Sequence, residues 1–296
     1  METLNTVYSS LIKKVFSDAK QASTRITPDN VYQLGDKNLL PYLDKMVCDL
    51  ALSGSGFSGI EHLTELWKKS QEGASCLILP EHYSNLDLPG FSYFLRKEMT
   101  EGERFADDLV AIAGKKLNED NPAVAAFASA YSRIVICPSR ELSLVNGKKD
   151  EAERLRVIQI NRAAMLALNR IKREHKMILV FPAGTRYRPW DPASKRGVRE
   201  MDSYIKNFDY MCLVAVNGEL LSVGKDSMMD DSIHKDILRY TVSPLIPCAE
   251  FRAKAKAEAE KNKVEDMKQA VVDTVMAELD KIHEAAEIER QKMLES

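Results

Sequence analysis

The chain has 296 residues, of which 45% are hydrophobic and 29% are charged, and its formal net charge is -2. This is ordinary globular composition, with enough length for one large domain or one domain with added segments. Because neither sign of charge dominates, we expect no nucleic-acid partner, and any anion site must be a local cluster. The five cysteines are scattered without a C-x-x-C pair, which argues against a disulfide framework or a metal site and favours reduced thiols.

The first residues contain no basic segment followed by an apolar core, so we expect no secretory signal peptide. No apolar stretch approaches the roughly 20 residues of a membrane-spanning helix. The longest apolar-rich stretch, 123–136, is interrupted by Arg133 and by serines. We therefore expect a cytoplasmic protein that is soluble or lies peripherally on the inner face of a membrane.

Three regions follow one another along the chain. Residues 1–72 repeat apolar side chains at helical spacing and predict an N-terminal helical segment. Residues 73–250 alternate helical patterns with short apolar runs, which are typical of βαβ units. The predicted fold is therefore an α/β domain, with a mostly parallel sheet flanked by helices. The predicted strands contain the apolar runs at 77–79, 109–113, 133–137, 177–181 and 212–216.

Residues 251–296 predict one long amphipathic C-terminal helix with a narrow apolar stripe. We expect this stripe to pack on its own subunit or to pair with a second chain in a homo-oligomer. Binding to a lipid surface is the alternative, but mixed acids and bases on the polar face weaken attraction to anionic lipid.

The first segment with catalytic chemistry directly follows the apolar run at 77–79. His82 and Asp87 lie at the exit of this predicted strand, five residues apart. A carboxylate that folds back onto the imidazole fixes its tautomer and makes it a general base for a hydroxyl. Ser84 or Asn85 is expected to cap the next helix, with Asp87 in its first turn. Alone, the pair can equally be a helix-start acid and a loop histidine.

The second segment, FPAGTR at 181–186, ends another predicted strand. Gly184 permits a tight turn with close backbone approach, and Thr185 supplies a hydroxyl. Arg186 and Arg188 form a cluster of two guanidinium groups, which suit phosphate oxygens. We therefore expect an anion pocket at this turn.

The strand at 133–137 lies between these segments in sequence, and Arg140 follows its exit. Exits of parallel strands share one edge of the sheet, so Arg140 is expected to join Arg186 and Arg188 at one phosphate facing His82. Lys115, after another strand, is a further candidate, with a solvated lysine as the alternative. Arg133, at the start of its strand, is expected at the opposite edge in a structural role.

Together these segments resemble the glycerolipid acyltransferases, which act on glycerol 3-phosphate or 1-acylglycerol 3-phosphate. The H-x4-D block of that family matches 82–87, and its F-P-E-G-T-R block matches 181–186 except at Ala183. The resemblance covers roughly residues 57–250 and includes a looser match to the middle strand. Two departures are Ala183 in place of the usual glutamate and Glu81 in place of the asparagine that often precedes the histidine.

The resemblance implies that His82 removes a proton from a glycerol hydroxyl while Asp87 orients the imidazole. It also implies direct attack on an acyl thioester, with Arg140, Arg186 and Arg188 holding the acceptor phosphate. Gly184 and Thr185 are candidates for contacting the substrate or the oxyanion. No metal or bound cofactor is implied, because coenzyme A or acyl carrier protein enters with the donor.

The missing acid at 183 and the R-x-R-P run favour glycerol 3-phosphate as acceptor, since both features occur in soluble plastid members of the family. The alternative is 1-acylglycerol 3-phosphate. A further alternative is a non-catalytic membrane-surface or scaffolding protein. The histidines at 175, 234 and 283 have no metal-ligand spacing and are interpreted as surface or structural residues.

Overall fold

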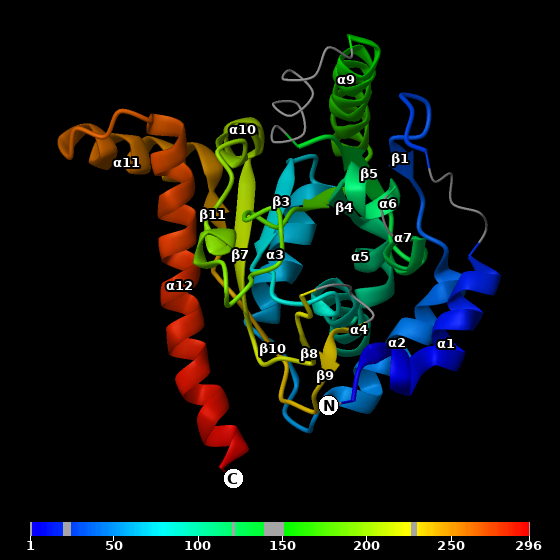
Figure 1. Ribbon diagram of the computed structural model, residues 1–296. Helices are drawn as coiled ribbons and strands as arrows, with labels where there is room; N and C mark the ends of the chain where they lie inside the picture. Colours follow the sequence, from blue (N-terminus) through cyan, green and yellow to red (C-terminus); the bar gives the residue numbers. More distant parts are fainter. Residues whose placement is uncertain (1, 20–24, 120–121, 139–150, 226–229, 296) are drawn as a thin grey trace.

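A central sheet with helices on both faces forms the body of the protein (Figure 1). The computed structural model describes residues 2–19, 25–119, 122–138, 151–225 and 230–295. The strands in this part of the chain are β1 (Tyr32–Gln33), β2 (Gly56–Ser58), β3 (Cys76–Pro80), β4 (Leu109–Gly114), β5 (Arg133–Ile136), β6 (Met177–Leu179), β7 (Tyr210–Asn217), β8 (Leu221–Ser222), β9 (Ser232–Ile233), β10 (Arg239–Val242) and β11 (Ile246–Pro247).

The sheet has the strand order β1-β5-β4-β6-β3-β7-β10-β2, and β11 pairs with β7. The strands β5, β4, β6, β3 and β7 are parallel, whereas β1 and β10 are antiparallel to their neighbours β5 and β7. Each predicted apolar run lies in or overlaps one of the parallel strands, so the prediction of a mostly parallel α/β sheet is confirmed. The C-terminal ends of these strands share one edge, where ligand sites form in such folds.

The described helices cover the two faces of the sheet. They are α1 (Leu4–Asp18), α2 (Leu40–Leu50), α3 (Ile60–Gln71), α4 (Asp87–Glu98), α5 (Gly102–Asp108), α6 (Lys115–Glu119), α7 (Pro122–Ala128), α9 (Glu151–Arg173), α10 (Met201–Asn207), α11 (Cys248–Lys261) and α12 (Met267–Leu294), with 3-10 turns η1 (Lys37–Leu39) and η2 (Pro192–Lys195).

β3 shows why the central strands are apolar at every position. All five of its residues are buried. Cys76 and Ile78 pack into a core with α1 to α5, while Leu77 and Leu79 pack into a second core with α9 to α12. Successive side chains of a strand point to opposite faces, so a strand covered on both faces has no solvent side.

The first 72 residues belong to the same body as the sheet. They supply β1 and β2 to the sheet and α1 to α3 to the first core. β1 pairs with β5 and β2 pairs with β10, so these residues border the sheet at both ends of its strand order.

The C-terminal region contains the predicted long helix, α12, which packs along β7 and β10. The prediction of one continuous helix from residue 251 is wrong, because the chain breaks between α11 and α12. Lys263 has a φ of 55° there, a left-handed conformation that ends a helix. Asp266 then caps α12, accepting hydrogen bonds from the backbone N–H groups of Lys268 and Gln269.

Among the described residues, no helix has the length and apolar character needed to cross a membrane.

Candidate active site

His82 and Asp87 meet in the loop between β3 and α4. His82 Nδ1 lies 2.9 Å from Asp87 Oδ2, and Asp87 is only 3% exposed. The same carboxylate accepts hydrogen bonds from the backbone N–H of Tyr83 (2.6 Å) and from both the N–H (2.8 Å) and the hydroxyl (2.9 Å) of Ser84. These donors fix the carboxylate beside the imidazole, so the side chains that the sequence singled out are brought together.

The first turn of α4 is anchored by its backbone as well. The hydroxyl of Tyr240 in β10 donates to the carbonyl oxygen of Asp87 at 2.7 Å. Gly90 makes room for that hydroxyl, since a Cβ there would lie 2.4 Å from it. The expected side-chain cap by Ser84 or Asn85 is wrong, because Leu86 is the N-cap residue and makes no side-chain bond. The Ser84 hydroxyl instead bridges the N–H of Leu86 and the Asp87 carboxylate.

The imidazole of His82 has a defined orientation. Its ring stacks on Phe181 with 3.9 Å between centroids and 16° between planes. Because the Asp87 carboxylate only accepts, the neutral imidazole carries its proton on Nδ1 and leaves Nε2 as the basic nitrogen. The carbonyl oxygen of His82 accepts a hydrogen bond from the N–H of Tyr187 at 2.8 Å, which joins the two motifs through their backbones.

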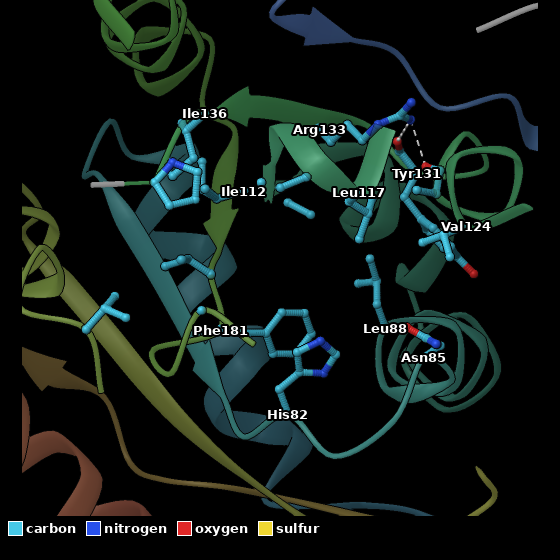
Figure 2. A pocket seen from close by; sticks show the side chains of 18 of the residues that line it. His82, Asn85, Leu88, Ile112, Leu117, Val124, Tyr131, Arg133, Ile136 and Phe181 are labelled. Atoms are coloured by element: carbon cyan, nitrogen blue, oxygen red, sulfur yellow. Dashed lines mark hydrogen bonds between the residues drawn. The ribbon is translucent and has the colours of Figure 1, made fainter. Parts of the chain in front are cut away.

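A cavity of about 290 Å³ lies in front of His82. Figure 2 shows His82 and Phe181 at one end, Leu88 at the side and Ile136 at the far end. Most of its wall is apolar, with contributions from β4, α4, α6 and α7. The arrangement places a basic nitrogen at the end of a space suited to an apolar group.

The turn after β6 contains the other predicted residues. Gly184 has a φ of 65°, as the tight turn requires, and its N–H donates to the carbonyl oxygen of Phe181 at 2.9 Å. This N–H is therefore used within the turn, and the Thr185 hydroxyl is a further candidate donor. The Thr185 hydroxyl lies 3.3 Å from Nη2 of Arg188.

Arg186 and Arg188 have different surroundings. Arg186 Nη1 lies 2.7 Å from Oδ2 of Asp231, which is fully buried and also contacts the Asn85 amide at 3.3 Å. Burial raises the pKa of Asp231, and the Arg186 charge only partly offsets this. Arg188 is more exposed and lies 3.9 Å from Asp191. Sequence reasoning missed Asp231, since nothing in its local pattern marks it.

Two further basic residues, Arg140 and Lys115, are also predicted at the site. Arg140 lies outside the described residues. Lys115 begins α6, and its ammonium lies 3.0 Å from Glu153 and 3.8 Å from Glu119. Lys115 is thus already paired with carboxylates.

Arg133 begins β5, as the sequence predicts. It is 3% exposed and lines the cavity of His82. Its guanidinium donates to the carbonyl oxygens of Ala128 (2.8 Å) and Tyr131 (3.4 Å), at and just beyond the end of α7 (Figure 2). Burial lowers the Arg133 pKa to about 10. The expected structural role agrees with these contacts, and the side chain also lines the cavity.

A second buried polar cluster adjoins the loop between β3 and α4. Glu81 is 4% exposed and accepts hydrogen bonds from the N–H of Val216 (3.0 Å), the hydroxyl of Tyr83 (2.8 Å) and Nδ1 of His283 (2.7 Å). Lys195 Nζ lies 3.9 Å from the same carboxylate. The interpretation of His283 as a surface or structural residue missed this contact. Its spacing of four from Leu279 on the apolar stripe was the available signal.

Comparison with known protein families finds a match. The Acyltransferase family model matches residues 57–205. These include β3, the His82–Asp87 pair and the turn after β6 that contains Arg186 and Arg188. The chain belongs to the acyltransferase family. No curated protein matches it. Membership implies an enzyme that transfers acyl groups, and the matched region contains the residues around the cavity of about 290 Å³.

Proposed function

We propose that this acyltransferase moves a fatty acyl group from an acyl thioester to a hydroxyl of glycerol 3-phosphate, as a step in phospholipid biosynthesis. The observation that carries the proposal is the His82–Asp87 pair, 2.9 Å apart, at the end of a mostly apolar cavity. The acyl chain of the donor, bound to coenzyme A or acyl carrier protein, would occupy the apolar part of that cavity.

The chemistry follows from the orientation of the imidazole. Nε2 of His82 takes the proton of the acceptor hydroxyl as its oxygen attacks the thioester carbonyl. Asp87 stabilises the resulting imidazolium through Nδ1–H. When the tetrahedral intermediate collapses, the C–S bond breaks and the imidazolium returns the proton to the leaving thiolate. No acyl-enzyme forms, since the acceptor oxygen itself makes the new ester bond.

The acceptor phosphate would be held by Arg186 and Arg188, with Arg140 as a third proposed ligand. A guanidinium has five N–H donors, so Arg186 can contact Asp231 and still present others to a phosphate. Binding energy from the phosphate would position the hydroxyl at Nε2. Thr185 would contact the substrate or the oxyanion.

Release of free thiol tests the proposal directly. Purified protein would be given palmitoyl thioesters of coenzyme A and of acyl carrier protein, each with glycerol 3-phosphate or its 1-acyl derivative. We expect release that depends on glycerol 3-phosphate and is lost in His82→Ala. His62→Ala is the matched control, because that side chain is also partly buried but lies on α3, outside the residues that line the cavity. Absence of release with either acceptor, from folded protein, would contradict the proposal.

One observation favours 1-acylglycerol 3-phosphate as a second candidate acceptor. A neighbouring cavity of about 220 Å³ shares Leu88, Ala111 and Tyr131 with the first. An acceptor that already carries a chain needs such additional apolar space. Release of free thiol with the 1-acyl derivative, and not with glycerol 3-phosphate, would identify 1-acylglycerol 3-phosphate as the acceptor.

A further inference from the structure

Helix α9 is apolar on two opposite faces. Its inner face packs on the sheet through Val157, Ile160, Ala164, Ala167, Leu168 and Ile171, all of which are buried. Its outer face also carries large apolar side chains, and they are exposed. These are Leu155 (47% exposed), Ile158 (42%), Met165 (52%) and Leu166 (64%).

These four residues form one stripe rather than scattered positions. With about 100° of rotation per residue, all four point within about 60° of the direction of Arg162. Arg162, itself exposed, therefore lies in the middle of the stripe. Grouped apolar side chains on a helix that already has a buried face indicate an interaction surface.

Basic side chains predominate around the stripe, and the acids of α9, Glu151 and Glu153, lie in its first turn. Residues 154–173 contain six Arg or Lys side chains and no Asp or Glu. Arg154 pairs with Glu151 and Arg170 with Glu174, both beyond the ends of that stretch. In the part of the chain that the structure describes, no carboxylate forms an ion pair with Arg162 or Arg173.

An anionic lipid surface matches this combination better than a second copy of the chain. Pairing two α9 stripes would bring Arg162 and its counterpart together in the middle of the contact. In a bilayer, the apolar side chains enter the acyl boundary while the arginines extend to the phosphates. We propose that the outer face of α9, centred on Arg162, docks the protein onto an anionic lipid bilayer.

The position of α9 suits this role. The Asn161 amide bonds both backbone groups of Cys137, at 2.8 and 2.9 Å, directly after β5. Ile136 and Pro138, on either side of Cys137, line the cavity of His82. Figure 1 shows α9 at the end of the molecule opposite the C-terminus. Docking through α9 would therefore place the cavity near the lipid.

Vesicle flotation of the full-length protein tests this inference. Vesicles of pure phosphatidylcholine would be compared with vesicles containing equal amounts of phosphatidylcholine and phosphatidylglycerol. We expect preferential binding to the anionic vesicles, weakened by salt. Arg162→Glu and Leu166→Glu should each reduce binding by roughly fivefold or more. Ile288→Glu on α12 is the matched control, because Ile288 is 62% exposed, and it should bind normally.

Three outcomes would overturn the inference: equal binding to both vesicle types, undiminished binding of the two α9 variants, or a dimer that Leu166→Glu dissociates. Circular dichroism would check that the variants remain folded. Transfer to glycerol 3-phosphate without vesicles should be unchanged in these variants. Flotation needs no catalysis, so failure of docking and failure of the proposed reaction can be told apart.

Discussion

The carboxylate of Glu81 lies 2.7 Å from Nδ1 of His283, so the residue before His82 is held by the C-terminal helix. Val216 of β7 and Tyr83 of the loop between β3 and α4 donate to the same carboxylate. α12 thus contributes to the environment of that loop, although it lies outside the residues matched by the family model. We infer that Glu81 and His283 act as positioning residues.

Replacing His283 with Ala should lower kcat by roughly ten- to hundredfold with little change in KM, because the loop that carries His82 loses a support. It should also cost about 1–3 kcal/mol of unfolding free energy, since a buried carboxylate loses a donor. Steady-state kinetics and denaturant unfolding would measure both. His283→Asn retains a side-chain donor and should recover part of kcat. Normal kcat in a destabilised Ala variant would leave His283 with a structural role only.

Asp87→Asn should lower kcat by roughly 10²–10⁴-fold while the protein remains folded. The neutral amide carries no negative charge with which to stabilise the imidazolium, although its oxygen can still accept from the N–H groups of Tyr83 and Ser84. Ser84→Ala is a suitable control, because it removes one donor and keeps the carboxylate. The control should lose less than about tenfold. Near-normal turnover of Asp87→Asn in the thiol-release assay would contradict the hypothesis that Asp87 orients the His82 imidazole.

Arg186→Lys should raise KM for the phosphate-bearing acceptor by roughly tenfold and change kcat less. A lysine keeps the charge but cannot contact Asp231 and a phosphate through one planar fork. Initial rates at varied acceptor concentration would separate the two constants. An unchanged KM would place the acceptor phosphate elsewhere.

The raised pKa of Asp231 predicts how the stability of the protein depends on pH. Its folded-state pKa lies above the ordinary 3.8, so the folded state takes up this proton first as pH falls. The wild type should therefore gain stability relative to Asp231→Asn between that raised pKa and 3.8. Thermal unfolding of both proteins from pH 7 to pH 4 would test this. Any excess of the Tm of Asp231→Asn over that of the wild type should shrink or change sign as the pH falls. A difference in Tm that stays constant would contradict the raised pKa.

The parallel strands could be predicted from sequence because a strand buried on both faces must be apolar throughout. Cys76 to Pro80 show this pattern within one short segment. The break before α12 was less visible, since Asn262 and Lys263 are also compatible with a continuous helix. In the structure it is marked by the left-handed backbone of Lys263 and by the Asp266 cap of α12.

In the candidate site, too, contacts between residues close in sequence could be predicted, and contacts between distant residues could not. His82 and Asp87 are close in sequence, so their meeting could be predicted from spacing alone. Glu81 and His283 are 202 residues apart, and Arg186 and Asp231 are 45 apart. Such pairs depend on how segments far apart in the sequence pack together, which no local pattern encodes.

The hydrogen bond from Tyr187 to the carbonyl of His82 has a consequence for positional selectivity. It ties the backbone that carries the imidazole to the turn that carries Arg186 and Arg188. The main chain therefore limits the distance between the base and the two guanidinium groups. For the proposed acceptor, held by its phosphate, that distance would select which hydroxyl along the glycerol is acylated.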